Sequence, residues 1–135
     1  MRPSDDAAKR VLVDLKRNVI NARDAKAAER YFAVDYRNDV PGRAPGLAGL
    51  QAALVEFFAA FPDVEESIDV LLAEGDLVAS RGTIRATHRG PFLGVPATGK
   101  RVTFGIQEIS RIANGVVVEQ WVSFDVAGLL AQLRD

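Results

Sequence analysis

The stretch that decides the fold of this chain is Asn114-Gly115-Val116-Val117-Val118-Glu119-Gln120-Trp121-Val122-Ser123-Phe124-Asp125. The Asn-Gly pair is typical of a two-residue turn between antiparallel strands, because both residues tolerate positive φ. The β-branched and aromatic run that follows predicts the second strand of this hairpin. Asp125 comes next, and an apolar segment, 126–134, is expected to be helical. An ionisable group at the end of an apolar strand is a candidate for the wall of a binding site.

Three further strands are expected before this one. Residues 100–113 would form the partner strand of the hairpin, residues 77–88 are rich in β-branched side chains, and a shorter strand starts near Glu65. Glycine and proline residues over 89–99 predict a loop. Because helical segments come first and antiparallel strands follow, the order of elements predicts an α+β fold.

The first half of the chain is expected to be mainly helical. Apolar spacing predicts a helix over 5–21, with Lys16 off its apolar face, and a short second helix over 24–32. Turn-forming residues and two Pro-Gly pairs predict a loop over 35–46. A stripe of Leu and Phe side chains over 47–61 predicts a third helix that packs on the sheet.

The hairpin also predicts which side chains share a face of the sheet. With Asn114-Gly115 as the turn, Ala113 pairs with Val116, and continuing along the strands pairs Glu108 with Trp121 and Phe104 with Asp125. One face then mixes aromatic side chains with carboxylates, as the wall of a pocket would: Phe104, Ile106, Glu108, Ser110, Ile112, Val117, Glu119, Trp121, Ser123 and Asp125. The other face includes an apolar set that needs cover: Val116, Val118, Val122 and Phe124. A bulge would exchange the two faces beyond it.

Composition narrows the class of protein. A chain of 135 residues predicts a single domain over 1–135. It has no cysteine and one histidine, His88, so a zinc, copper or iron site is not expected. The 17 basic and 18 acidic residues are spread along the chain, without the basic block typical of nucleic-acid binding. Because the sequence shows no signal peptide and no apolar run of membrane-spanning length, we expect a cytoplasmic protein. Because it shows no glycine-rich phosphate loop, we expect no cofactor.

Several segments, taken in order, carry a resemblance to a known family: Phe61-Pro62-Asp63, Ala73-Glu74-Gly75-Asp76, residues 87–100, residues 111–115, Glu119-Gln120-Trp121 and residues 125–133. Together they resemble the SnoaL-like polyketide cyclases, also called ester cyclases, which have the nuclear transport factor 2-like, cystatin-like fold. The resemblance implies a cone-shaped α+β barrel in which N-terminal helices pack on a curved antiparallel sheet.

The resemblance also implies roles for particular residues. In that family an Asp at the end of the last strand is the acid/base of an intramolecular aldol ring closure, and Asp125 matches it. An Asn that lines the cavity matches Asn38. The chain departs from the family pattern at three positions: a pocket His of the cyclases corresponds to Glu108, a neighbouring Gln to Ile106, and a His common in relatives to Asp39. The implied ligand is a small hydrophobic compound that contains a carbonyl group.

Further substrate-binding candidates follow from position. Phe104 and Trp121 would line an apolar pocket around Asp125, and Tyr36 would either donate to a ligand carbonyl or close the mouth of the cone. His88 is a further candidate, because it is the only histidine and could act as a base. A structural hydrogen bond at the end of its strand is the favoured interpretation.

Two interpretations of the main candidates stay open. Asp125 is either the acid/base or the N-cap of the following helix, for which Asp is well suited. Glu108 is either a pocket carboxylate or part of a surface ion pair. The leading hypothesis is an enzyme for aldol cyclisation of a polyketide-like substrate. The alternatives are another cone-fold chemistry (isomerase, dehydratase, epoxide hydrolase or hydroxylase) and a non-catalytic ligand-binding domain. A homodimer through the apolar outer face is also expected.

Overall fold

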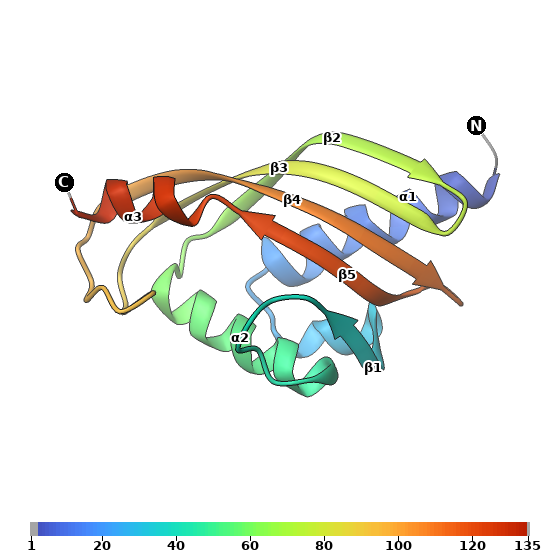
Figure 1. The fold of residues 1–135 in the computed structure, drawn as a ribbon, viewed down its shortest axis with the longest axis horizontal. Coiled ribbons are helices and arrows are strands. Elements are labelled where there is room, and N and C mark those ends of the chain that lie inside the picture. The colour runs from blue at the N-terminus through green and yellow to red at the C-terminus, as the bar shows by residue number, and fades with distance from the viewer. Residues whose placement is uncertain (1–2, 135) are drawn as a thin grey trace.

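The computed structural model describes residues 3–134 (Figure 1). Helical segments and one strand make up the first half, and four consecutive strands and a last helix make up the second. In chain order the elements are α1 (Pro3–Leu15), a π-helical segment (Lys16–Ile20), a 3₁₀ segment (Lys26–Arg30), β1 (Phe32–Asn38), α2 (Gly46–Ala60), β2 (Glu65–Glu74), β3 (Leu77–Thr87), β4 (Arg101–Ala113), β5 (Val116–Phe124) and α3 (Val126–Arg134). The four strands β2 to β5 follow one another along the chain, as the sequence predicted.

The five strands form one mixed sheet with the order β1-β5-β4-β3-β2. The pairs β2–β3, β3–β4 and β4–β5 are antiparallel, and β1 pairs with β5 in parallel. The sheet curves over α1 and α2 in Figure 1, with α1 packed against β2 and β3, α2 against β1, and α3 against β4. Helices packed on a curved sheet confirm the predicted α+β, cone-type fold.

Two groups of buried apolar side chains fill the space under the sheet. The first joins α1, the start of β1 and α2, and includes Leu12, Val19 and Leu50. The second joins the end of α2, the last part of β3, the start of β4 and α3, and includes Phe61 and Phe104. Because the helical stripe over 47–61 contributes to both groups, α2 holds the two ends of the molecule together.

The first half of the chain departs from the sequence prediction in three places. The first helix begins at Pro3 and changes to π-helical geometry over Lys16–Ile20. The second helix is a short 3₁₀ segment, Lys26–Arg30. The loop predicted over 35–46 is wrong at its start, because Phe32–Asn38 is strand β1. This strand contains Asp, Arg and Asn and has no clear alternation, so only its pairing with distant β5 defines it.

The hairpin register also departs from the prediction. Ala113 pairs with Val116 as expected, but a bulge follows, and Arg111 then pairs with Glu119. Val118 is the extra residue, so every later residue of β5 turns to the opposite face. Glu108 therefore lies opposite Val122 and not Trp121. The predicted faces are wrong beyond the bulge: Gln120, Val122 and Phe124 point under the sheet, while Glu119, Trp121 and Ser123 lie on the outer side.

No helix within residues 3–134 combines the length and apolar character needed to cross a bilayer.

Candidate functional site

A cavity of about 510 Å³ lies between the two apolar groups, under the concave side of the sheet. Its wall is mostly apolar: Leu15, Val19, Phe32, Leu50, Leu54, Phe57, Ile84, Phe92, Phe104, Ile106, Val122 and Phe124. Charged lining residues include Lys16, Glu66 and Glu108 deep in the structure and Arg43 and Glu56 nearer the surface. This size and polarity suit a small, largely apolar ligand held by a few polar groups.

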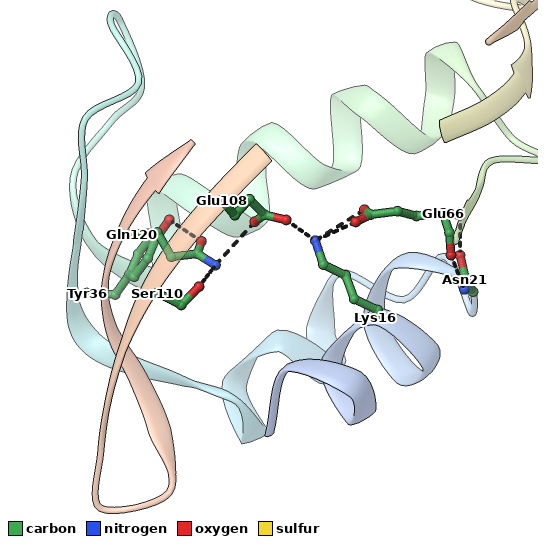
Figure 2. Close-up of polar contacts among 7 residues, drawn as sticks. All are labelled: Lys16, Asn21, Tyr36, Glu66, Glu108, Ser110 and Gln120. Atoms are coloured by element: carbon green, nitrogen blue, oxygen red, sulfur yellow. Dashed lines mark hydrogen bonds and ion pairs between the residues drawn. The ribbon is translucent and has the colours of Figure 1, made fainter. Parts of the chain in front are cut away.

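Three ionisable side chains meet at the polar end of the cavity. The ammonium group of Lys16 lies between two carboxyl groups, as Figure 2 shows. It donates to Glu108 and to Glu66, with Nζ 3.1 Å from Glu66 Oε1 and 3.0 Å from Oε2. The three side chains are 5%, 3% and 7% exposed for Lys16, Glu66 and Glu108. When all three are ionised, this buried group carries one negative charge in excess.

A hydrogen-bonded chain extends from Glu108 across the sheet (Figure 2). Gln120 Nε2 donates to Glu108 Oε2 at 3.3 Å and to Ser110 Oγ at 2.9 Å. Tyr36 donates its hydroxyl to Gln120 Oε1 at 2.9 Å. Because the amide of Gln120 is held at three points, it fixes the second oxygen of Glu108 while Lys16 holds the first.

The local backbone explains how the lysine directly after α1 reaches this position. Lys16 opens the π-helical segment, and such insertions in a helix often occur at functional sites. One turn later, Asn21 pairs with the backbone of Glu66: Nδ2 donates to its carbonyl at 3.1 Å and Oδ1 accepts from its N–H at 2.7 Å. Gly82 leaves room for both the backbone and the side chain of this segment, because a Cβ there would lie 2.8 Å from the Ser67 carbonyl oxygen and 3.0 Å from Glu66 Oε2.

Burial and charge act in opposite directions on these groups. Burial by itself lowers the pKa of Lys16, but the carboxylates of Glu108 and Glu66 outweigh it, so the pKa lies above its ordinary value. Burial raises the pKa of Glu66, and the neighbouring Glu108 adds to this, while Lys16 only partly offsets it. The site therefore holds a firmly protonated lysine and a carboxyl group, Glu66, that binds a proton more readily than usual.

Tyr36 is almost fully buried, and its ring packs edge-to-face on Phe32 at 5.0 Å between centroids. Burial raises the pKa of its phenol to about 12, although Arg43 nearby acts to lower it and Glu108 adds to the increase. Tyr36 is thus a neutral donor whose hydrogen bond is directed to Gln120 and not to the cavity.

The structure places the predicted site residues in different parts of the molecule. Phe104 and Glu108 line the cavity, as does Ile106. Tyr36 and Asn38 lie on β1 and are not among the lining residues; the side-chain oxygen of Asn38 instead accepts the N–H of Val40 at 2.9 Å.

Asp125 lies outside the cavity and caps α3. It is exposed, and its Oδ1 accepts the N–H of Gly128 at 2.9 Å while its carbonyl accepts that of Leu129. Gly128 leaves room for this rotamer of the cap, because a Cβ there would lie 2.1 Å from Asp125 Oδ2 and the side chain would have to turn. The predicted opposition of Asp125 and Phe104 is wrong because of the bulge. The geometry supports the capping role of Asp125. Its carboxylate does not line the cavity, as an acid/base would have to.

Trp121 and His88 are also separate from the cavity lining. Trp121 lies on the outer face of the sheet, 5.8 Å from the Arg111 guanidinium, so its predicted place beside Glu108 is wrong. His88 is fully buried, and its Nδ1 contacts Thr98 Oγ1 at 2.9 Å and accepts the Thr98 N–H at 3.2 Å. These contacts hold the 89–99 loop against the end of β3, as the structural interpretation expected.

Four polar residues of the site were missed at the level of sequence: Lys16, Arg43, Glu66 and Gln120. A signal existed for Lys16, because it lies four residues after Leu12 and three before Val19, on the buried helical face. Its predicted position off that face is wrong. Gln120 was assigned to the outer face by the missed bulge. Within residues 3–134 no cluster of three or more His, Cys, Asp or Glu side chains is arranged to hold a metal ion.

Comparisons with known proteins agree with this architecture. Residues 10–133 match the sequence family described as SnoaL-like polyketide cyclase. AclR of Streptomyces galilaeus, which is proposed to be a hydroxylase, is 29% identical with a TM-score of 0.87, over 97% of this chain and 98% of its own. TsrD of Streptomyces laurentii is 28% identical with a TM-score of 0.83, over 98% and 96% of the two chains. IdmH of Streptomyces antibioticus, proposed to be a polyketide cyclase, is 29% identical with a TM-score of 0.80, over 95% and 99%. No curated protein matches the sequence.

Proposed function

Because the chain belongs to the SnoaL-like polyketide cyclase family, we propose that it is an enzyme that transfers protons within a small, largely apolar carbonyl compound. The specific reaction proposed is an intramolecular aldol closure of a polyketide-like substrate. The observation that carries the proposal is the buried carboxylate of Glu108 at the polar end of an otherwise apolar cavity of about 510 Å³. A base that removes a proton from carbon works best when water is excluded and its orientation is fixed.

The contacts of Glu108 support giving it the acid/base role that the family resemblance implies for Asp125. One oxygen is held by Lys16 and the other by Gln120, so the carboxylate is oriented before the substrate arrives. Glu108 would remove a proton from the carbon next to a carbonyl, and the resulting enolate would attack a second carbonyl of the same molecule. A carbon–carbon bond forms, and Glu108 returns the proton to the new alkoxide oxygen. Atoms and electrons balance between substrate and carboxylate, so the proposed reaction requires no cofactor.

The developing negative charge needs a cationic or donating partner. Tyr36 and Asn38 were expected to supply it, but Tyr36 already donates to Gln120 and Asn38 lies outside the lining. Among the described lining residues, Lys16 and Arg43 are the two that carry positive charge. Lys16 is saturated by carboxyl groups, so we assign the enolate oxygen to Arg43, in the loop between β1 and α2.

A non-catalytic ligand-binding domain remains the second candidate. The observation that favours it is that Asp125, the acid/base implied by the family resemblance, bonds to helix amides and not to the cavity. In that case Glu108 would only help to orient a bound ligand.

One experiment decides between these two functions. Exchange of α-protons for deuterium in a panel of aromatic ketones and polyketide esters, followed by NMR, reports proton abstraction directly and does not require the natural substrate. Glu108→Gln should slow the exchange by about 10²–10⁴-fold, the usual contribution of a general base. The matched control is Glu65→Gln, which removes the same charge from an exposed position on β2. Equal exchange in wild type and Glu108→Gln would contradict the enzyme and favour the binding domain.

We also propose a homodimer through the outer face of the sheet, although with different residues from those expected. Val122 and Phe124 line the cavity instead. The outer face carries its own apolar row across four paired strands, Leu72, Ala79, Ile109 and Trp121. Three of these side chains are large and exposed, by 63%, 44% and 36% for Leu72, Ile109 and Trp121. A second copy would cover this row by two-fold symmetry, in which the same patch meets itself.

A further inference from the structure

The polar side chains under the sheet differ in what they can still offer to a ligand. Lys16 directs its N–H groups at both oxygens of Glu66 and at Glu108. Gln120 uses its amide N–H groups on Glu108 and Ser110. Tyr36 uses its hydroxyl on Gln120. The donors of Lys16, Gln120 and Tyr36 are therefore occupied, and Ser110 lies outside the cavity lining. What the network can offer toward the cavity are carboxylate lone pairs, each oxygen having two.

The network is also uneven in charge from one end to the other. At one end of the network the positive charge of Arg43 acts to lower the pKa of Tyr36. The carboxyl group of Glu66 lies toward the other end, beyond Lys16 (Figure 2). Lys16 is shared by two carboxyl groups, so one negative charge stays unbalanced on the Glu66 and Glu108 side. A buried excess of negative charge favours a ligand group that donates a hydrogen bond and disfavours a carbonyl or carboxylate oxygen.

Glu66 is positioned for this purpose by contacts that a surface carboxylate would lack. Its backbone is held at both its N–H and carbonyl by Asn21, its side chain is 3% exposed, and it lines the cavity. Gly82 opposite provides the space that the carboxyl occupies. Burial raises the pKa of Glu66, and the nearby Glu108 adds to the increase, so a further hydrogen-bond donor from a ligand would stabilise the charged carboxylate.

We infer that Glu66 is a ligand-binding residue that accepts a hydrogen bond from a phenolic or enolic hydroxyl of the substrate. The ligand would lie with this hydroxyl at Glu66, its carbonyl toward Arg43 and its acidic carbon at Glu108. The inference rests on the proposed function for the location of the site, and it adds the chemical class of the ligand. A substrate with hydroxyl and carbonyl groups at opposite ends of a flat apolar ring system fits this arrangement.

The test compares two probes that differ by one methyl group. One is an acetyl-naphthol with its hydroxyl and acetyl groups on opposite rings, and the other is its methyl ether, which keeps the shape and the carbonyl but cannot donate. Isothermal titration calorimetry on the full chain should show that the naphthol binds roughly tenfold more tightly or better, as expected for one hydrogen bond to a charged acceptor. Glu66→Gln should bring the two affinities close to equality, while Glu65→Gln should preserve the preference.

Each result has a defined meaning. Equal affinities in the wild type would overturn the inference, and so would an unchanged preference in Glu66→Gln. Failure of both probes to bind at their solubility limit would also overturn it. The wild-type comparison does not depend on the folding of a variant. Equal α-proton exchange in wild type and Glu108→Gln, with an intact preference for the naphthol, would overturn the enzyme alone, so the two proposals fail separately.

Discussion

The ammonium group of Lys16 and the carboxylate of Glu108 form an ion pair under the sheet, although the two residues lie 92 positions apart in the sequence. Moving such charges out of water costs several kcal/mol per ion, and a single partner often fails to offset that cost. Here Lys16 serves two carboxyl groups, which is a poor arrangement for stability alone. Its place in the wall of a cavity instead agrees with a site in which a charged, oriented carboxylate is needed.

The first prediction concerns the loss of this shared cation. Lys16→Met keeps the length and apolar stem of the side chain but leaves Glu66 and Glu108 without it. We expect the free energy of unfolding to fall by about 3–5 kcal/mol at neutral pH, the usual cost of removing one partner from a buried ionic group. The loss should shrink as the pH falls, because protonated carboxyl groups need no cation.

Arg17→Met is the matched control, since it removes the same charge from the neighbouring exposed position. Denaturant unfolding of both variants over a range of pH makes the comparison. Stability of Lys16→Met equal to that of wild type at neutral pH would show that the two carboxyl groups do not depend on the lysine.

The second prediction concerns Tyr36 at high pH. Burial raises its pKa from 10.0 to about 12, so the folded state favours the neutral phenol. The stability gained from this shift is complete below pH 10 and is lost as the pH rises toward about 12. Absorbance titration of phenolate should show one late-ionising tyrosine that is missing in Tyr36→Phe and retained in Tyr31→Phe. A late step that survives in Tyr36→Phe would assign it to another group.

Long, regular elements were predictable from the sequence because their signals are local. The Asn114-Gly115 turn, the glycine-rich loop over 89–99 and the apolar stripe of α2 all depend on neighbouring residues. Strand β1 was missed for the opposite reason, since its backbone partners come from β5, far along the chain. Its own residues, with Asp35 and Arg37 exposed, resemble a loop.

The site was harder to predict than the fold, because one bulge determines which side chains of β5 face the cavity. Val118 is a β-branched residue in a run of three valines, and nothing in its type marks it as the extra residue. That single insertion brings Gln120 and Val122 to the cavity and moves Trp121 out. Glu66 reaches the site through the space at Gly82 and the anchor at Asn21, and both contacts join segments distant in the sequence.

The third prediction concerns the outer face of the sheet. If a second copy covers the row from Leu72 to Trp121, Ile109→Asp should place a charge in the centre of the interface and produce a monomer. Val34→Asp is the control, because Val34 is 83% exposed and lies outside this row. Light scattering at tens of micromolar should give a dimer mass for wild type and the control. A wild-type monomer under these conditions would refute the proposed dimer.

The last prediction separates the two interpretations of Asp125. Its Oδ1 accepts the Gly128 N–H at 2.9 Å, and the residue lies outside the lining of the cavity. Asp125→Ala should therefore lose about 1 kcal/mol of stability, whereas Asp125→Asn should melt like wild type, because Asn is an equally good N-cap. With Glu108 as the base, both variants should keep α-proton exchange close to the wild-type rate. The measurements are thermal melts and the same NMR exchange assay. A loss of about 10²-fold or more in Asp125→Asn, with an unchanged melt, would instead place the base at Asp125. The cavity would then have to rearrange on ligand binding for this carboxylate to reach the substrate.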